Sequence, residues 1–252
     1  MIYVEIDPRF ERLGNWMFKY AAAKTAAKGG EVTIVIDDDD YIHRFLEYRE
    51  LFPDPIVKHA PEGAEVRIDL YADYKYIDPE IARKVFKAPT EREDFVSIHV
   101  RRGDYLHLPQ FFPFVGEEYL RKAVASFGPE RRFKVFSDDI KWCKKFFTGP
   151  RFEFSEGKTA LEDLYGIARC RDHISSNSTF SWWGALLGPG GRTIFPSMWF
   201  GIANDVKDWS GYYFPGSEVI ENSYSPALLR YAKWCIFKRS VRHFFKRLKH
   251  HK

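Results

Sequence analysis

Two adjacent arginines follow an apolar, β-branched run in the segment Phe95–Tyr105, FVSIHVRRGDY. A guanidinium is a planar fork of donors that matches phosphate oxygens. Gly103 lets the backbone turn sharply or approach a ligand closely. In open α/β sheets, ligands bind at the carboxyl ends of the strands. The segment therefore predicts an anion site containing Arg101 and Arg102; the alternative is a solvated basic turn.

A second polar turn lies in the segment Asp172–Gly188, DHISSNSTFSWWGALLG. Hydroxyl and amide side chains fill positions 175–179, directly before a predicted helix over Phe180–Leu187. The first amides of a helix have no partner within it, and such an end attracts phosphate. The alternative is an ordinary N-cap with Trp182 and Trp183 in the core.

A third strand-to-helix junction lies between these two. The segment Phe133–Phe136 is predicted to be a strand, and an amphipathic helix is predicted after Asp139. Asp138 and Asp139 stand at the corner, where carboxylates can hold ribose hydroxyls or a base edge. The alternative is that they cap the helix.

These three motifs, together with Leu13–Ala21 (LGNWMFKYA), resemble the α-1,2-fucosyltransferases of glycosyltransferase family 11. The resemblance spans Leu13 to Phe200. It implies a GT-B-like α/β fold of two Rossmann-like domains with the nucleotide site in the C-terminal one. It also implies an inverting, metal-independent glycosyltransferase that moves L-fucose from GDP-β-L-fucose to a glycan hydroxyl, O2 of a terminal galactose. GDP-fucose is then the donor substrate, and no cofactor is expected.

The resemblance also implies roles for individual residues. Arg101, Arg102 and Asp104 are expected to be catalytic, with the arginines stabilising the GDP leaving group; the catalytic base is left open among Asp104, Asp7 and Glu5. The donor-binding residues expected are His99, Gly103, Asp138, Asp139, Ser176, Asn177, Ser178, Thr179 and Phe180. Those expected to line the cleft between donor and acceptor are Gly14, Asn15 and Trp16.

The chain departs from the family pattern at that cleft. Family members usually read Gly-Leu-Gly-Asn-Gln where this chain has Arg12-Leu13-Gly14-Asn15-Trp16. A cation and a large ring replace a flexible residue and an amide, so the acceptor can differ from the usual galactoside. The acidic run Asp37–Asp40 contains the Asp-x-Asp spacing of metal-dependent transferases. Its early position favours a solvated helix start instead.

Composition indicates a globular protein, because 45% of the 252 residues are hydrophobic and 17% are aromatic. Three cysteines, Cys143, Cys170 and Cys235, fit neither a metal spacing nor an even disulfide framework. The start MIYVEIDPRF lacks the pattern of a signal peptide or anchor. We therefore expect a cytoplasmic protein.

The expected organisation is a β-α-β start with a strand over 2–6, a helix over 14–28 and a strand over 32–36. From residue 94, strands and helices alternate, which predicts a parallel sheet. We expect an acceptor-side domain over 1–93, a GDP-sugar-binding domain over 94–225 and a basic amphipathic tail over 226–252.

The tail has nine Lys or Arg and no acid after Glu221. Trp234, Phe237, Val241, Phe244, Phe245 and Leu248 share one helical face. Such a pattern is typical of a helix that lies in a membrane interface; the alternative is a packed terminal helix. We expect peripheral contact with the inner face of the cytoplasmic membrane and a lipid-linked or oligosaccharide acceptor, without nucleic acid as a partner. The alternative function is a non-catalytic nucleotide-sugar-fold module attached to membrane or nucleic acid through this tail.

Overall fold

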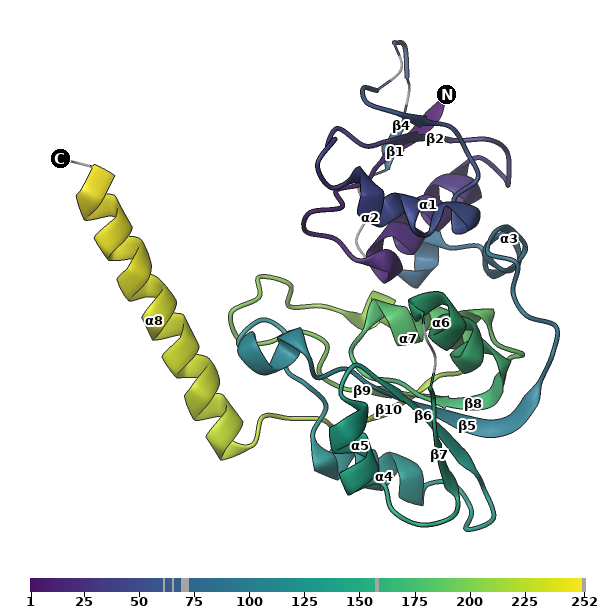
Figure 1. Ribbon diagram of the computed structural model, residues 1–252, viewed down its shortest axis with the longest axis vertical. Coiled ribbons are helices and arrows are strands. Elements are labelled where there is room, and N and C mark those ends of the chain that lie inside the picture. Colours follow the sequence, from purple (N-terminus) through teal and green to yellow (C-terminus); the bar gives the residue numbers. More distant parts are fainter. Residues whose placement is uncertain (61, 65, 69–72, 157–158, 251–252) are drawn as a thin grey trace.

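The computed structural model describes residues 1–60, 62–64, 66–68, 73–156 and 159–250 (Figure 1). They form two α/β units, each built on a parallel sheet, with a long helix at the C-terminal end of the chain. The α/β fold class with parallel sheets, expected from the sequence, is confirmed.

The first unit has a four-stranded sheet in the order β3-β2-β1-β4. A long helix, α1, follows β1; most of its residues are apolar and buried, because it packs on both its own sheet and the second unit. The elements are β1 Ile2–Glu5, α1 Leu13–Ala26, β2 Thr33–Val35, α2 Ile42–Leu46, β3 Ile56–Val57, β4 Val66–Ile68 and α3 Pro79–Val85.

The second unit has a six-stranded parallel sheet in the order β10-β9-β8-β5-β6-β7. Its central strand, β5, is buried from Val96 to Val100, as expected of a parallel strand covered on both faces. The elements are β5 Glu93–Val100, α4 Glu117–Ala125, β6 Phe133–Ser137, α5 Ile140–Phe146, β7 Phe152–Phe154, α6 Ala160–Arg169, β8 Cys170–Ile174, α7 Thr179–Leu187, β9 Thr193–Pro196 and β10 Glu218–Ile220.

The strand order of the second sheet reverses at β5. The chain moves outward from β5 to β6 and β7, then returns to place β8 on the other side of β5. Ligands of open α/β sheets bind outside the carboxyl ends of the strands at such a reversal. The two turns that contain Arg101 and Ser176 follow β5 and β8 and therefore flank this point.

Two helix layers cover the second sheet. Helices α4 and α5 cover one face, and α6 and α7 lie on the other, toward the first unit (Figure 1). Helices α1 and α3 both pack against α7. Trp182 and Trp183 of α7 join the same buried cluster as Phe18 and Phe86, so one hydrophobic core spans both units.

The last helix, α8 Pro226–His250, leaves the body at an angle and its far end projects away from it (Figure 1). Its near part touches the body, because Ala232 is fully buried and the Arg239 guanidinium lies over the Phe111 ring. Within the described part of the chain, no helix combines the length and apolarity that a membrane span requires.

The sequence missed part of the first sheet. No strand was predicted between the one over 32–36 and residue 94, where the structure has β3 and β4, and β10 was also not predicted. These strands have only two or three residues, too few for an alternating pattern to appear. The expected division of the chain at residue 93 stays a prediction.

Candidate functional site

Arg101 is the first residue after β5, and two carboxylates hold its guanidinium. Its Nη2 lies 2.8 Å from Asp104 Oδ1, and its Nη1 lies 3.0 Å from Asp138 Oδ2. The guanidinium carbon is 5.7 Å from the centre of the Tyr105 ring. The side chain remains 30% exposed. Arg101 is thus a fixed, accessible cation at the reversal point of the sheet.

Arg102 has a different environment, although it is the adjacent residue. Its guanidinium carbon lies 4.1 Å from the Trp142 ring centre, and Nε donates to Asp139 Oδ2 at 3.1 Å. The Phe114 ring lies on another side at 5.5 Å, and the side chain is 15% exposed. Stacking and a charge-assisted hydrogen bond together stabilise the junction of β5 with α5. Arg102 thereby positions the loop that carries Arg101.

Asp138 and Asp139 bind protein groups at this corner. Asp138 Oδ1 accepts the Arg102 backbone N–H at 2.8 Å, and Asp139 caps α5 by accepting the Trp142 N–H at 3.2 Å. The Asp138 carboxylate comes so close to Gly103 that an added Cβ would lie 2.5 Å from Oδ2. Both acids thus shape the arginine loop, and Asp139 takes the helix-capping role that the sequence had left open beside ribose or base contacts.

The turn after β8 is buried, and its side chains have partners within the protein. Ser176 bonds to His99, Ser178 caps α7 by accepting the Phe180 N–H at 3.3 Å, and Asn177 Nδ2 donates to the carbonyls of Pro113 and Trp199 at 2.7 and 3.0 Å. These three side chains were expected to bind the donor. In the structure they bond within the protein and hold the turn in place, and their role in donor binding stays a prediction.

His99 lies beneath the arginine loop, buried between Ser176 and Phe180. Its Nδ1 is 2.7 Å from Ser176 Oγ, and its ring centre is 5.6 Å from that of Phe180. Burial, with the nearby positive charge of Arg101, lowers the pKa of His99 to about 3. The imidazole is therefore neutral near pH 7 and buttresses the β8 turn.

Tyr105 was not selected from the sequence. Its hydroxyl donates to the Asn177 backbone carbonyl at 3.0 Å, and its ring lies under Arg101. Burial raises the pKa of this phenol. Tyr105 thus joins the loops after β5 and β8. An aromatic residue two positions after Gly103 in HVRRGDY is the signal that was available.

The start of α1, in the first unit, contacts the start of α7, in the second unit. Thr179 Oγ1 donates to Asn15 Oδ1 at 3.1 Å, and the Trp183 indole N–H donates to the Gly14 carbonyl at 2.9 Å. A Cβ on Gly14 would overlap the Thr179 side chain, so only glycine permits this approach. Gly14 and Asn15 therefore lie where the two units meet.

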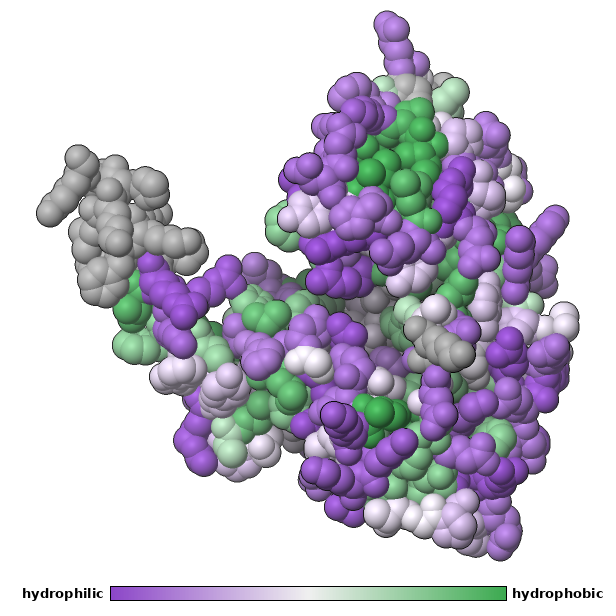
Figure 2. Space-filling model, viewed as in Figure 1, coloured by the Kyte–Doolittle hydropathy of each residue, from purple (hydrophilic) through white to green (hydrophobic). Residues whose placement is uncertain are grey.

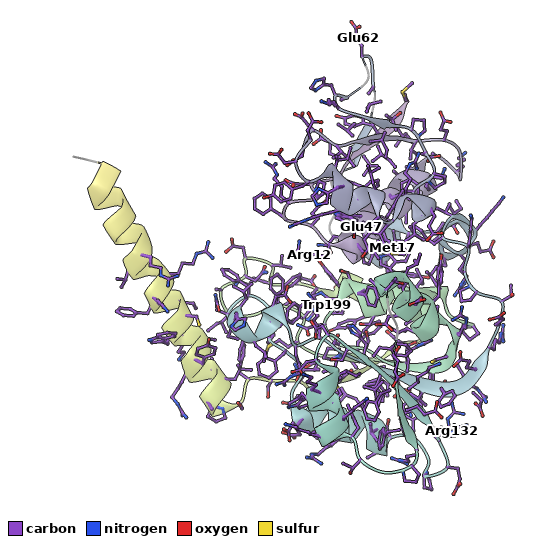
Figure 3. The ribbon with its side chains drawn as sticks, in the orientation of Figure 1. Arg12, Met17, Glu47, Glu62, Arg132 and Trp199 are labelled. Atoms are coloured by element: carbon purple, nitrogen blue, oxygen red, sulfur yellow. The ribbon has the colours of Figure 1, made fainter. Side chains whose placement is uncertain are left out.

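Trp16 does not line the cleft. It is 3% exposed, and its ring packs against Phe45 and Tyr48 inside the first unit, because the side chain points away from α7. Arg12, in contrast, is exposed at the lower edge of the first unit, above Trp199 in the view of Figure 3. The surface is hollowed between the two units on the side toward α8 (Figure 2).

The three base candidates lie at different edges. Asp104 stands at the arginine loop with its side chain 45% exposed, whereas Glu5 and Asp7 line a cavity beyond the carboxyl end of β1. A hydrogen bond from Arg9 lowers the pKa of the Asp7 carboxyl. In the acidic run, Asp38 lies 2.9 Å from Arg9 Nε and Asp39 lies 2.6 Å from Lys58 Nζ.

Comparison with known proteins identifies the class of this chain. Residues 80–200 match the family model described as Glycosyl transferase family 11. This match covers the arginine loop, both aspartates of the β6 corner and the β8 turn. Residues 80–200 of this chain thus match glycosyltransferase family 11, and the resemblance drawn from its motifs is confirmed.

Individual relatives are similar over part of their length. An Escherichia coli alpha-1,2-colitosyltransferase is 38% identical over 120 residues, which is 42% of this chain and 41% of that protein. The Escherichia coli O-antigen biosynthesis glycosyltransferase WbnK is 33% identical over 142 residues, 52% of this chain and 46% of that protein. The matched regions span less than half the length of both relatives.

Solved structures with a similar arrangement include one bacterial enzyme. The E. coli heptosyltransferase WaaC with ADP has a TM-score of 0.49 and 11% sequence identity; the match covers 93% of this chain and 100% of that one.

Proposed function

We propose that this chain is an inverting fucosyltransferase that moves L-fucose from GDP-β-L-fucose to a glycan hydroxyl, O2 of a terminal galactose. The observation that carries the proposal is Arg101, an accessible guanidinium fixed at the reversal point of the second sheet. Relatives named for α-1,2 transfer of colitose or fucose support this donor class and favour an enzyme over a binding module.

Cleavage of the bond between fucose and phosphate leaves negative charge on the GDP β-phosphate and positive charge on the sugar ring. Arg101 stabilises that phosphate by exchanging part of its contact with Asp104 and Asp138 for phosphate oxygens. Asp104 and Asp138 orient the guanidinium before the donor binds. Preorganised donors of this kind lower the barrier because little reorganisation remains for the reaction step.

The experiment is turnover of GDP-fucose with galactoside acceptors, followed by product analysis and GDP release. Transfer with inversion, unaffected by EDTA, is the expected result. Loss of activity in EDTA that is restored by Mn²⁺ would contradict a metal-independent mechanism. Binding of GDP without any turnover across an acceptor panel would instead favour the non-catalytic binding module.

We also propose that α8 docks the enzyme on an anionic membrane surface, where a lipid-linked glycan is within reach. Tyr231, Trp234 and Phe237 are 40%, 50% and 66% exposed, on a helix that also carries Lys233 and Lys238. Each cation near an anionic surface contributes about 1 kcal/mol. Lys252 and the side chains of Phe244, Phe245, Lys246, Arg247, Leu248 and Lys249 lie outside the described residues.

Vesicle co-sedimentation tests the docking. The full chain should sediment with anionic vesicles at low salt and remain in solution with neutral vesicles or at high salt. The double variant Trp234→Ser/Phe237→Ser should bind weakly, whereas Leu46→Ser, which changes an exposed apolar residue of α2, should behave as wild type. Equal sedimentation of the double variant and the wild type would exclude this surface.

A further inference from the structure

The cavity that Glu5 and Asp7 line lies at the carboxyl edge of the first sheet, away from the donor edge, which is the arginine loop and the turns after β6 and β8 of the second sheet. It has a volume of about 520 Å³ and is lined by the segments that follow β1, β2 and β3, with Lys19 of α1. This edge of a parallel α/β sheet is where ligands bind. None of the groups that build the donor edge lines this cavity, so it is a separate candidate site.

The charged side chains of the cavity are held in place by one another. Arg9 donates from Nη2 to Asp7 Oδ2 at 3.0 Å, and its Nε lies 2.9 Å from Asp38 Oδ2. Lys19 Nζ lies 2.5 Å from Glu11 Oε1, and the other oxygen of Glu11 accepts the Asp7 backbone N–H at 3.1 Å. Groups fixed before a ligand arrives lose little conformational entropy on binding. The cavity is thus preorganised for a polar ligand.

Asp37 differs from its neighbours. Its side chain is exposed at the cavity wall, and among the described residues it makes no hydrogen bond or ion pair. A carboxylate is an acceptor with room for several donors. Asp37 can therefore accept two adjacent hydroxyls of a sugar, while the Arg9 side chain beside it supplies donors.

The charge balance selects among polar ligands. Five carboxylates, those of Glu5, Asp7, Glu11, Asp37 and Asp38, face three cations, Arg9, Lys19 and Lys58. The cations are paired with carboxylates, whereas no described residue pairs with Asp37, so an anionic ligand would lie beside an uncompensated like charge, which disfavours its binding. A neutral sugar has no such penalty and can use both the carboxylates and the guanidinium.

The cavity lies close to the donor edge along the chain. Glu11 lines the cavity, and Asn15, four residues later, bonds to Thr179 at the start of α7. Four residues span at most about 14 Å even when fully extended. A glycan held in the cavity can therefore extend toward the start of α7, where the two units meet.

We propose that this cavity binds the acceptor glycan through an uncharged sugar, with Asp37 accepting its hydroxyls and Arg9 donating to its oxygens. This inference rests on the proposed function and specifies its acceptor. Acceptors whose sugar carries a carboxylate are excluded by the wall charge.

The test is binding of methyl β-galactoside and methyl β-galacturonoside to the full chain with GDP present, by saturation-transfer NMR titration. The two ligands differ in the carboxylate at C6. Wild type should bind the galactoside and bind the uronoside at least ten-fold more weakly. Asp37→Asn should weaken galactoside binding about ten-fold, as a lost hydrogen bond to a charged group does, and narrow the gap between the two ligands.

Glu130→Gln, which changes an exposed acid of the second unit, is the matched control and should bind as wild type. Unchanged galactoside binding in Asp37→Asn, with a wild-type unfolding midpoint, would overturn the proposal, as would equal binding of both ligands to wild type. This assay needs no turnover. Absence of GDP-fucose turnover with every acceptor would instead overturn the proposed function.

Discussion

The two sheet edges of this molecule differ in the charged group that each leaves available to a ligand. At the second sheet, carboxylates surround two arginines, and hydrogen bonds join the turns after β5, β6 and β8, leaving Arg101 as the accessible cation. At the first sheet, ion pairs hold the cations of a cavity, and the exposed carboxylate of Asp37 has no ion pair among the described residues. The difference matches two ligands, a diphosphate at one edge and a neutral sugar at the other.

The largest expected effect on turnover comes from substitution of Arg101. Arg101→Lys should lower kcat by about 10²–10³-fold, because a point charge does not reproduce the geometry of a guanidinium fork on the β-phosphate. The unfolding midpoint should stay near that of wild type, since the side chain is partly exposed. Steady-state kinetics and thermal unfolding measure the two quantities.

Arg121→Lys is the control, because Arg121 is an exposed arginine of α4 that pairs with Glu117. Near-normal kcat in Arg101→Lys would show that the Arg101 guanidinium does not stabilise the β-phosphate. The second sheet's edge would then have no assigned anion-binding group to set against the first.

A second prediction concerns the packing that shapes the arginine loop. Gly103→Ala places a methyl 2.5 Å from Asp138 Oδ2 and must displace the carboxylate that holds Arg101. We expect a loss of about 1–3 kcal/mol in unfolding free energy, as for other overpacked sites, and at least a ten-fold fall in kcat (~1.4 kcal/mol).

Gly128→Ala provides the comparison, because no atom lies within 4 Å of its added Cβ. Equal stability and turnover of the two alanine variants would show that the close approach at Gly103 is not required. Chemical unfolding and steady-state kinetics on both proteins decide this.

The third prediction uses pH and concerns the buried histidines beneath the second edge. His173 bonds through Nδ1 to Ser97 Oγ at 2.9 Å, and burial lowers its pKa to about 3. The folded pKa lies below the unfolded value, so the unfolded chain binds the proton first. This contribution to stability is complete above pH 6.5 and is lost as the pH falls toward 3, by about 1.4 kcal/mol per pH unit for one site.

His173→Asn should therefore show a shallower fall of unfolding free energy than wild type between pH 6.5 and pH 4. Denaturant unfolding at several pH values gives this slope. Identical slopes in the two proteins would mean that His173 is not held neutral. No transition in kcat near pH 6.5 should arise from His99, which is neutral throughout that range.

Much of the second sheet followed from the sequence because its signals are contiguous. The strand, the arginines and Gly103 form one run, and each of the polar turns lies directly between a strand and a helix. Parallel strands bring such turns to one edge, so the placement of Arg101, Asp138 and Ser176 near one another was predictable. Some helix starts can also be recognised from the sequence. At α6, for example, Thr159 and Glu162 have the spacing of a capping box, and the structure forms it.

The sequence could not predict which group each polar side chain at the second sheet's edge binds. Residue type alone does not tell whether Ser176 faces a ligand or His99, or whether Asp139 caps a helix or binds ribose, because both choices satisfy the same polar atoms. Burial decides the matter, and burial depends on the whole fold. Trp16 shows the same limit, because its position next to Asn15 suggested the cleft while packing placed it in the core.

The cavity at the first edge could not be predicted for a different reason, although the sequence had singled out Glu5, Asp7 and the run Asp37–Asp40. This cavity is assembled from segments after three strands that have two to four residues each. Arg9, Asp37 and Lys58 are far apart in the chain and form no motif. Only the three-dimensional arrangement shows that Arg9 lies between Asp7 and Asp38.

The central claim is that Arg101 binds the β-phosphate of the donor at the reversal point of the second sheet. Calorimetric titration of GDP and of GMP into wild type and Arg101→Ala tests it directly, because the two nucleotides differ in that phosphate. The account predicts that wild type binds GDP much more tightly than GMP. Arg101→Ala should lose most of this preference while its affinity for GMP is unchanged. An unaltered preference for GDP in the variant, or an equal loss of affinity for both nucleotides, would contradict the account.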